Sequence, residues 1–198
     1  SAIRTKKNSS LVRALEITKS DPEAVGMISA GSTGAVLAGG IFKIGRIKGV
    51  LRPALCPLLP TMKGGKVCII DCGANVDCRP EYLVQFALMG SSYMKACGVE
   101  NPRVALVSVG VEDKKGNELT HEVFARLKQL PMNFVGNMEA RDALSGEYDV
   151  LVCDGFVGNV LLKSIEGTAS MVMKTMKKEV MSSFSAKIGA LLMKKALG

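Results

Sequence analysis

Tryptophan is absent from this 198-residue sequence, and aromatic residues make up only 5% of it. Proteins that bind single-stranded nucleic acid stack the bases on aromatic side chains, so this scarcity argues against such a function. The sequence also contains no helix-turn-helix or zinc-finger pattern. Nucleic acid is therefore the partner that the sequence supports least.

Patterns of metal ligands are scarce as well. There is one histidine, His121, and none of the six cysteines forms a Cys-x-x-Cys pair, whereas zinc sites need closer spacing. Cys68, Cys72 and Cys78 could gather around a metal, but Cys68 and Cys153 lie in apolar, strand-like runs. We therefore expect buried, reduced thiols in a reducing cytosol and no metal site. We interpret His121 as a surface residue of a helix and not as a general base.

Long apolar segments are missing too. No signal peptide and no apolar run of 18 residues is present, which argues against secretion and against a membrane span. The chain does not begin with methionine, and no strand closes its last unit. We therefore expect a fragment of a longer protein.

The sequence is rich in apolar residues and in positive charge. Hydrophobic residues make up 47% of the chain, which argues against disorder, and the length suits one domain with a sizeable core or part of a larger one. The formal net charge of +8 predicts acidic partners, such as phosphate-bearing substrates, anionic lipids or an acidic protein.

Strand-like and helix-like segments alternate along the chain. Strands are predicted at Val25–Ser29, Ala54–Leu59, Lys66–Asp71, Arg103–Val109, Met132–Gly136 and Val150–Asp154. Helices are predicted at Ser10–Lys19, Gly34–Ile44, Glu81–Cys97, Glu118–Gln129 and Val160–Val180, with another from Ser182 onward. This alternation predicts an α/β fold with a mainly parallel sheet covered on both faces.

Polar turns follow five of the predicted strands. They are Ser29–Gly34, Asp71–Asp77, Gly110–Asn117, Gly136–Glu139 and Asp154–Asn159. Because the turns after parallel strands share one edge of a sheet, we expect all five to converge on one cleft. The turn Asp71–Asp77 is the most informative, since it carries two carboxylates, a carboxamide and a glycine within seven residues.

Each turn also has a purely structural interpretation. Ser32 or Thr33 could cap a helix and not hold phosphate. Lys115 could be a solvated charge, with Asn117 as a helix cap, and not stabilise an anion. Asn159 could form a local Asx turn and not donate to a substrate. The sequence leaves both interpretations open.

The C-terminal segment is basic and amphipathic. Apolar residues recur at steps of three and four from Met173 to Leu192, with lysines near them. This pattern is typical of a helix packed on its own domain or on a dimer partner, and also of a helix at a membrane surface. Ser182 and Ser183 predict a break between two helices.

Seven stretches, in one order over nearly the whole chain, resemble the bacterial phosphate acyltransferases of phospholipid synthesis, the PlsX family. They are KKNSS (6–10), SAGSTGA (29–35), GRIKGVLRPAL (45–55), DCGANVDCRPEYLVQFALMGS (71–91), EDKKGNELT (112–120), NFVGNMEARD (133–142) and CDGFVGNVLLKSIEG (153–167). The chain departs from the family at Ser32, often asparagine there, and at Cys72 and Cys78, where smaller or apolar residues occur.

The resemblance implies transfer of a fatty acyl group from acyl carrier protein to inorganic phosphate, giving acyl phosphate for phospholipid synthesis without a metal or nucleotide cofactor. It implies a homodimer with a three-layer α/β/α sandwich, similar to phosphotransacetylases and to isocitrate/isopropylmalate-dehydrogenase-like enzymes. We expect one α/β domain over residues 1–180, incomplete at both ends, and an amphipathic helical segment of that domain over 181–198. The competing hypotheses are a phosphotransacetylase-like enzyme that uses acyl-CoA and a non-catalytic scaffold at a membrane surface.

By the same resemblance, Lys115 stabilises the oxyanion, Asn159 orients a carbonyl or phosphate, and Asp77 positions the site or pairs with Lys115. The expected substrate-binding residues are Ser32, Thr33, Gly34, Asn75, Asn117, Asn137 and Gly158.

The resemblance also assigns partners to the positive charge. Arg46, Lys48 and Arg52 are candidate contacts for acyl carrier protein. A cytoplasmic enzyme is expected to associate peripherally with the anionic inner face of the cell membrane through residues 182–197, and with a downstream acyltransferase. The expected membrane or partner residues are Phe184, Lys187, Ile188, Leu191, Leu192 and Lys194.

Overall fold

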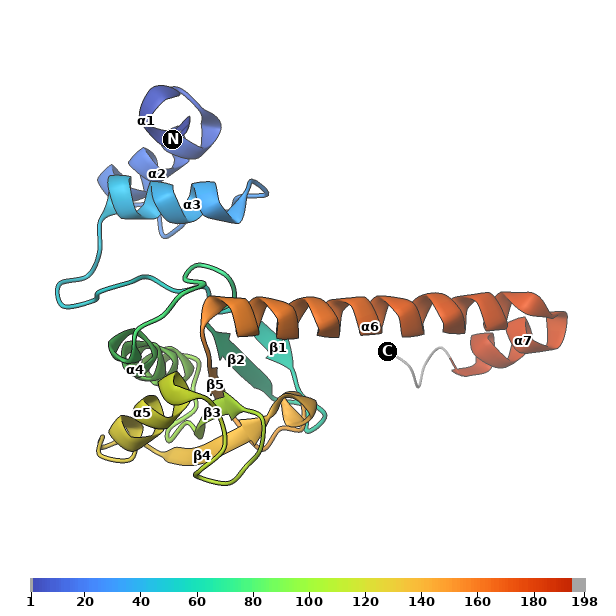
Figure 1. Ribbon diagram of the computed structural model, residues 1–198. Coiled ribbons are helices and arrows are strands. Elements are labelled where there is room, and N and C mark those ends of the chain that lie inside the picture. The colour runs from blue at the N-terminus through green and yellow to red at the C-terminus, as the bar shows by residue number, and fades with distance from the viewer. Residues whose placement is uncertain (1, 194–198) are drawn as a thin grey trace. The chain divides into compact units, whose positions relative to one another are not determined.

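The computed structural model describes residues 2–193. Contacts divide the chain into two compact units, Ser1–Asn159 and Val160–Gly198. The first unit opens with helices α1 (Ala2–Thr5), α2 (Ser10–Ser20) and α3 (Thr33–Gly39), and α3 continues as a π-helical segment, η1 (Gly40–Ile44) (Figure 1). These helices pack on one another. The side chains of Val12 and Leu15 are buried there.

A five-stranded sheet follows in the same unit. Its strands are β1 (Leu58–Pro60), β2 (Lys66–Ile70), β3 (Val104–Ser108), β4 (Phe134–Glu139) and β5 (Val150–Val152), in the spatial order β1-β2-β5-β3-β4. The β1–β2 pair is antiparallel, whereas the β2–β5, β5–β3 and β3–β4 pairs are parallel. The predicted α/β class with a mainly parallel sheet is confirmed.

Helices α4 (Pro80–Ala96) and α5 (Glu118–Leu127) cover one face of the sheet. Phe86 and Phe124 pack there against alternate strand residues such as Ile70 and Val152. The intervening strand residues, such as Ile69, are also buried, so both faces of these strands are removed from water. A short 3₁₀ segment, η2 (Ala140–Asp142), follows β4.

Three strand predictions need correction. Val25–Ser29 is not a strand, because no segment within residues 2–193 pairs with it, and Val25 and Ile28 are fully exposed. Without a neighbouring strand, the backbone N–H and C=O groups of an extended segment cannot form the hydrogen bonds of a sheet. Ala54–Leu59 contributes only its end to β1. The predicted strand Met132–Gly136 lies two residues further along and runs to Glu139, so Gly136–Glu139 is strand and not a turn.

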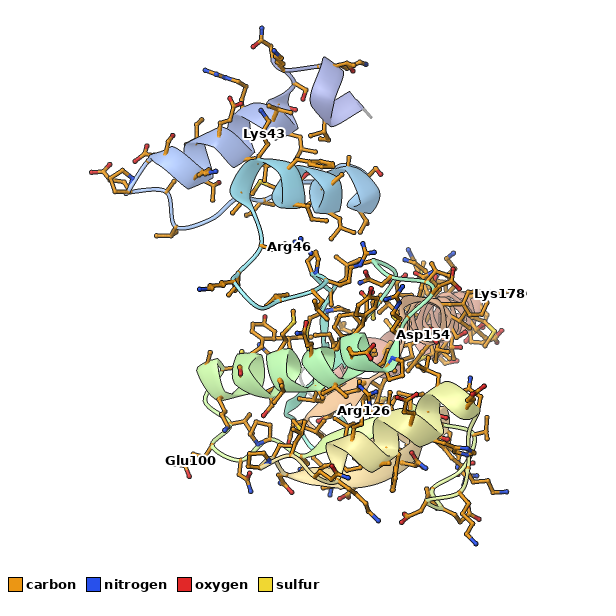
Figure 2. The ribbon with its side chains drawn as sticks, turned by 60° about the vertical axis from the view of Figure 1, so that its left-hand side comes forward. Lys43, Arg46, Glu100, Arg126, Asp154 and Lys178 are labelled. Atoms are coloured by element: carbon orange, nitrogen blue, oxygen red, sulfur yellow. A yellow bond between two sulfur atoms is a disulfide. The ribbon has the colours of Figure 1, made fainter. Side chains whose placement is uncertain are left out.

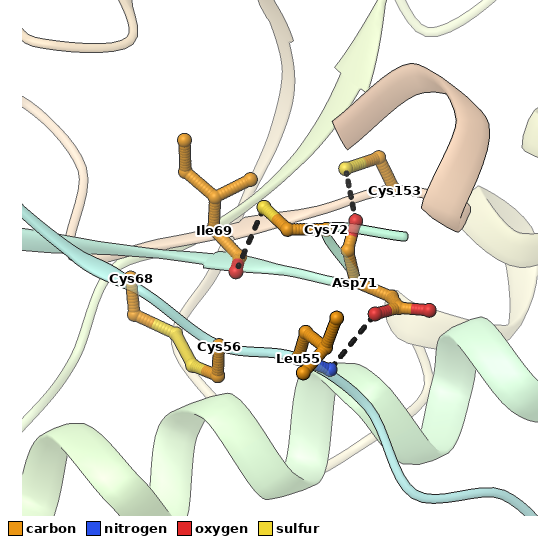
Figure 3. Close-up of a disulfide and its surroundings, with 7 residues drawn as sticks. All are labelled: Leu55, Cys56, Cys68, Ile69, Asp71, Cys72 and Cys153. Carbon is orange, nitrogen blue, oxygen red and sulfur yellow. Dashed lines mark hydrogen bonds between the residues drawn. A yellow bond between two sulfur atoms is a disulfide. The ribbon is translucent and has the colours of Figure 1, made fainter. Parts of the chain in front are cut away.

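The expectation of reduced thiols is wrong for Cys56 and Cys68, which form a disulfide (Figure 3). The segment before β1 runs antiparallel beside β2, where the Ile69 amide donates to the Pro57 carbonyl at 3.3 Å. This pairing brings the two cysteine Cα atoms to 5.9 Å, although 12 positions separate them in sequence. Cys72, Cys78, Cys97 and Cys153 are free.

The second unit contains most of α6 (Gly155–Ser182) and α7 (Phe184–Met193). The Ser183 hydroxyl accepts from the Ala186 amide at 3.1 Å, so it caps α7, and the predicted break between two helices is confirmed. Phe184 and Leu192 are about four-fifths exposed. None of the helices between residues 2 and 193 has both the length and the apolar character needed to cross a membrane.

Candidate active site

Three polar turns lie in a row at the carboxyl edge of the sheet. They follow β2, β5 and β3, which are neighbours and parallel, so the turns begin at Asp71, Cys153 and Val109 (Figure 1). Open α/β sheets bind ligands at this edge.

The carboxylate of Asp71 organises the first turn. Asp71 is fully buried, and its Oδ1 accepts from the backbone amides of Leu55 at 2.8 Å and Ala74 at 3.2 Å (Figure 3). Its Oδ2 accepts from the amide and the side-chain Nδ2 of Asn75, at 2.6 and 2.9 Å. Four donors therefore satisfy a charge that would otherwise be costly to bury.

The first turn of α6 packs directly on this structure. The Gly155 amide donates to the Asn75 carbonyl at 2.7 Å, and a Cβ on Gly158 would lie 1.9 Å from the Asp71 carbonyl oxygen. Only glycine permits that approach. Asp154 caps the helix by accepting from the Val157 amide at 2.7 Å. Figure 2 shows Asp154 at the start of α6.

Asn159 follows at the end of that turn and is exposed. A Cβ on Gly73 would lie 3.7 Å from the Asn159 side chain, so the candidate amide stands beside the glycine of the first turn. Asn159 and Gly158 are thus brought to the Asp71–Asn75 turn, as the sequence predicts for a common site.

The thiols around Asp71 are chemically quiet. Cys153 donates through Sγ to the Asp71 carbonyl at 3.6 Å, and Cys72 donates to the Gly158 carbonyl at 3.6 Å. Burial raises the pKa of Cys72 to about 12, and the neighbouring Asp71 charge adds to the effect. Burial likewise raises the pKa of Cys78 to about 11 and that of Cys153 well above its usual range. At neutral pH these thiols stay protonated, so none supplies a thiolate nucleophile.

Lys115 lies in the turn after β3. Its stem folds over the strand end, since a Cβ on Gly110 would lie 2.8 Å from both Lys115 Cγ and Glu112 Oε2. The Lys115 amide donates to the Glu112 carbonyl at 3.0 Å, which closes the turn. The side chain is exposed and forms no ion pair in the part of the chain that the structure describes.

Asn137 supports this turn from β4. It is 5% exposed, and its Nδ2 donates to the carbonyls of Glu112 at 2.8 Å and Lys115 at 3.5 Å. Its Oδ1 and the Ser108 Oγ are buried without a hydrogen-bond partner within residues 2–193. Asn137 thus holds the turn that carries Lys115 by hydrogen bonds to two of its carbonyl groups.

Two of the residues predicted to bind substrate, Asn75 and Asn117, form hydrogen bonds within the protein instead. Asn75 donates from Nδ2 to the Pro53 carbonyl at 2.8 Å as well as to Asp71. Asn117 caps α5, accepting from the Thr120 amide at 3.0 Å, as the structural interpretation of that residue predicts. Asp77 is exposed, and no ion pair joins it to Lys115 among the described residues.

Ser32, Thr33 and Gly34 do not follow a strand, because Val25–Ser29 is not one. They begin the short helix α3, are exposed, and the Ser32 side chain forms no capping hydrogen bond. The topological reason for expecting five converging turns therefore fails for this turn and for Gly136–Glu139. Lys194 lies outside the described residues.

The organising role of Asp71 is absent from the set of predicted site residues. A carboxylate directly after a fully apolar strand is a signal for it, because such a charge needs donors nearby. The backbone of the segment Pro53–Leu55, which supplies one of those donors, gives no sequence signal. Among residues 2–193, no group of three His, Cys, Asp or Glu side chains is arranged to hold a metal ion.

The fold defined by this sheet and its edge is that of the phosphotransacetylases. A branched-chain phosphotransacylase from Enterococcus faecalis V583 is similar with a TM-score of 0.55, at 17% identity, over 78% of this chain and 62% of that one. The EutD phosphotransacetylase from Staphylococcus aureus gives 0.54, at 17% identity, over 71% and 49%. At these identities the likeness establishes the fold alone.

Sequence comparison then gives the family. Residues 1–198 match the family described as "Fatty acid synthesis protein", and the chain belongs to that family. It is 54% identical to a phosphate acyltransferase of Bacillus cereus (strain B4264) over 99% of this chain, and 56% identical to one of Clostridium novyi (strain NT) over 98%. The chain spans 59% and 58% of the length of these two relatives. The resemblance seen in the sequence is confirmed.

Proposed function

We propose that this chain forms part of a phosphate acyltransferase, which transfers a fatty acyl group from acyl carrier protein to inorganic phosphate. The observation that carries the proposal is the row of turns after β2, β5 and β3, with exposed Asn159 beside the turn that Asp71 holds and exposed Lys115 on the turn that Asn137 supports. The 54% identity to a relative named phosphate acyltransferase supports the same reaction.

In this reaction a phosphate oxygen attacks the thioester carbonyl carbon. The carbonyl becomes an oxyanion, and then the C–S bond breaks and the thiolate leaves. The thiolate takes up one proton, which balances the proton that hydrogen phosphate loses on becoming acyl phosphate. Phosphate is already a nucleophile, so no protein nucleophile is required, which fits the protonated state of Cys72 and Cys153. We assign Lys115 to the developing negative charge and Asn159 to orientation of the carbonyl or phosphate.

The proposal is tested in the full-length natural protein by measuring phosphate-dependent release of thiol from acyl-acyl carrier protein. Lys115→Ala and Asn159→Ala should each lower kcat by about 100-fold, as loss of an oxyanion contact does. Lys114→Ala, at the neighbouring exposed lysine, is the control and should retain activity. Near-normal turnover in both test variants would refute the assigned roles.

A phosphotransacetylase-like reaction with acyl-CoA is the second candidate, favoured by the fold of the phosphotransacetylases. Comparing kcat/KM for the same acyl group on acyl carrier protein and on coenzyme A distinguishes the two. A protein that releases thiol from neither donor would favour the third hypothesis, a scaffold at the membrane surface.

We also propose that the enzyme works as a cytoplasmic homodimer at the inner face of the membrane, next to a downstream acyltransferase in phospholipid synthesis. The exposed apolar side chains of Phe184, Leu191 and Leu192 on α7, with Lys187 near them, support a surface contact. The positive balance of the chain supports an acidic carrier protein.

A further inference from the structure

An apolar cavity of about 360 Å³ lies in the first unit, between the helical segment α3–η1 and the segment that leads to β1. Val36, Leu37, Gly40, Ile41 and Ile44 line it from the helical side. Met89 of α4 lines it as well. The volume and apolar lining are those of a small-molecule site.

One wall of this cavity is bonded to the candidate active site. Pro53 and Leu55 line the cavity. The Pro53 carbonyl accepts from Asn75 Nδ2 at 2.8 Å, and the Leu55 amide donates to Asp71 Oδ1 at 2.8 Å. A ligand in the cavity therefore lies against the other side of the backbone that holds the Asp71–Asn75 turn.

A second cavity of about 400 Å³ adjoins the first, and the two share Ile41, Arg46 and Pro53. Arg46, on the segment after η1 (Figure 2), donates to the Leu51 carbonyl at 2.6 Å. Arg52 lies over the Tyr82 ring at 5.6 Å. Neither arginine has an ion-pair partner in the described part of the chain. An apolar compartment thus opens beside a basic one.

We infer that the apolar cavity holds the acyl chain of the donor and thereby sets the chain length that the enzyme accepts. The inference rests on the proposed acyl transfer. The apolar wall suits a hydrocarbon chain, and the adjoining arginines suit an anionic carrier. The backbone of Pro53–Leu55 lines the cavity and is bonded to the Asp71–Asn75 turn, so the thioester end of the acyl chain would lie near that turn. Each methylene buried in such a cavity strengthens binding.

Gly40 provides a way to fill the cavity without disturbing its walls. A Cβ on Gly40 meets no atom within 4 Å, and the residue lies in a helical segment, so Gly40→Leu extends into open space. Val36→Phe, one helical turn earlier, is a second and independent filling variant. Gly26→Leu is the matched control, because a Cβ there also meets no atom and Gly26 does not line the cavity.

The experiment compares kcat/KM for butyryl and palmitoyl donors in the full-length natural protein. Gly40→Leu should lower the palmitoyl-to-butyryl ratio by about tenfold or more, the effect of excluding two methylenes, with butyryl transfer retained. Val36→Phe should act in the same direction, and Gly26→Leu should leave the ratio unchanged. Retained butyryl transfer also shows that each variant folds.

The outcomes separate the inference from the proposed function. An unchanged ratio in both filling variants, with an active parent protein, overturns the inference alone and leaves a segment of the protein or a second copy as the occupant of the cavity. Equal loss with both donors also overturns it, since a chain-length site must discriminate. A parent protein that transfers neither acyl group to phosphate overturns the proposed function and the inference together.

Discussion

At the scale of single residues, Asp71 links the core to the candidate active site. Its carboxylate is fully buried, yet all four of its donors are backbone or amide N–H groups and none is a cation. The negative charge is therefore stabilised by the fold itself, and the turn cannot move without exposing or stranding that charge.

Asp71→Asn keeps the size of this side chain but removes its charge. The new amide nitrogen would face N–H donors in place of an acceptor, so the free energy of unfolding should fall by about 3 kcal/mol. Urea denaturation of the full-length protein measures the change. Asp77→Asn, an exposed neighbour, should change stability by less than about 0.5 kcal/mol. Equal stability of the two variants would show that the Asp71 network is not structural.

The sequence predicts that the turn at Asp71 is important, but it does not predict which of its residues hold the turn together and which face a ligand. Asn75 was predicted to bind substrate, whereas its amide donates to Pro53 and Asp71. Asp71 is four positions away, but Pro53 lies 22 positions earlier, and a hydrogen bond over that separation leaves no pattern in the sequence. By contrast, the cap formed by Asn117 is local, so spacing alone predicts it.

At the scale of elements, the contact between α6 and the β2–α4 turn sets the position of Asn159. Gly158→Ala places a Cβ where the Asp71 carbonyl oxygen lies at 1.9 Å, so helix and turn must separate. We expect a loss of stability of about 2 kcal/mol, typical of overpacking, together with reduced thiol release because Asn159 moves.

The control for this variant lies on the same helix. A Cβ on Gly167 meets no atom, so Gly167→Ala should raise stability by about 0.5 to 1 kcal/mol through helix propensity. Thermal denaturation monitored by circular dichroism compares the two variants. A Gly158→Ala protein as stable as Gly167→Ala would contradict the close packing of helix and turn.

The elements also show where sequence patterns succeed. Helices α4 and α5 begin at proline or capping signals and carry clear apolar faces, so their bounds were predicted within two residues at each end. The segment Val25–Ser29 has the apolar composition of a strand but pairs with no other strand within residues 2–193. Whether a segment finds a pairing partner depends on the rest of the fold, so its own residues do not predict it. Because this strand does not form, Ser32, Thr33 and Gly34 do not lie at the carboxyl end of a strand, where the sequence predicts them.

At the scale of the whole molecule, the exposed apolar residues of α7, with exposed Lys187 among them, support the proposed membrane contact. The variant Lys187→Glu, Lys194→Glu should lower binding to phosphatidylglycerol vesicles by at least about tenfold, since each basic residue near an anionic surface contributes about 1 kcal/mol. Sedimentation with vesicles measures the bound fraction. Lys95→Glu reverses the charge of an exposed residue on α4 and should leave binding unchanged. Unchanged binding of the double variant would refute the proposed membrane contact.

The position of β5 has a consequence for how the molecule is made. β5 is the last of the strands within residues 2–193, yet it lies between β2 and β3 and pairs with both. In the described sheet β5 alone joins the pairs β1–β2 and β3–β4, so the sheet becomes continuous only after Val150–Val152 has left the ribosome. The position of Asn159 depends on that late insertion, because α6, which carries Asn159, follows β5 directly. A nascent chain arrested before residue 150 should therefore hold a divided sheet and lack the turn that leads into α6.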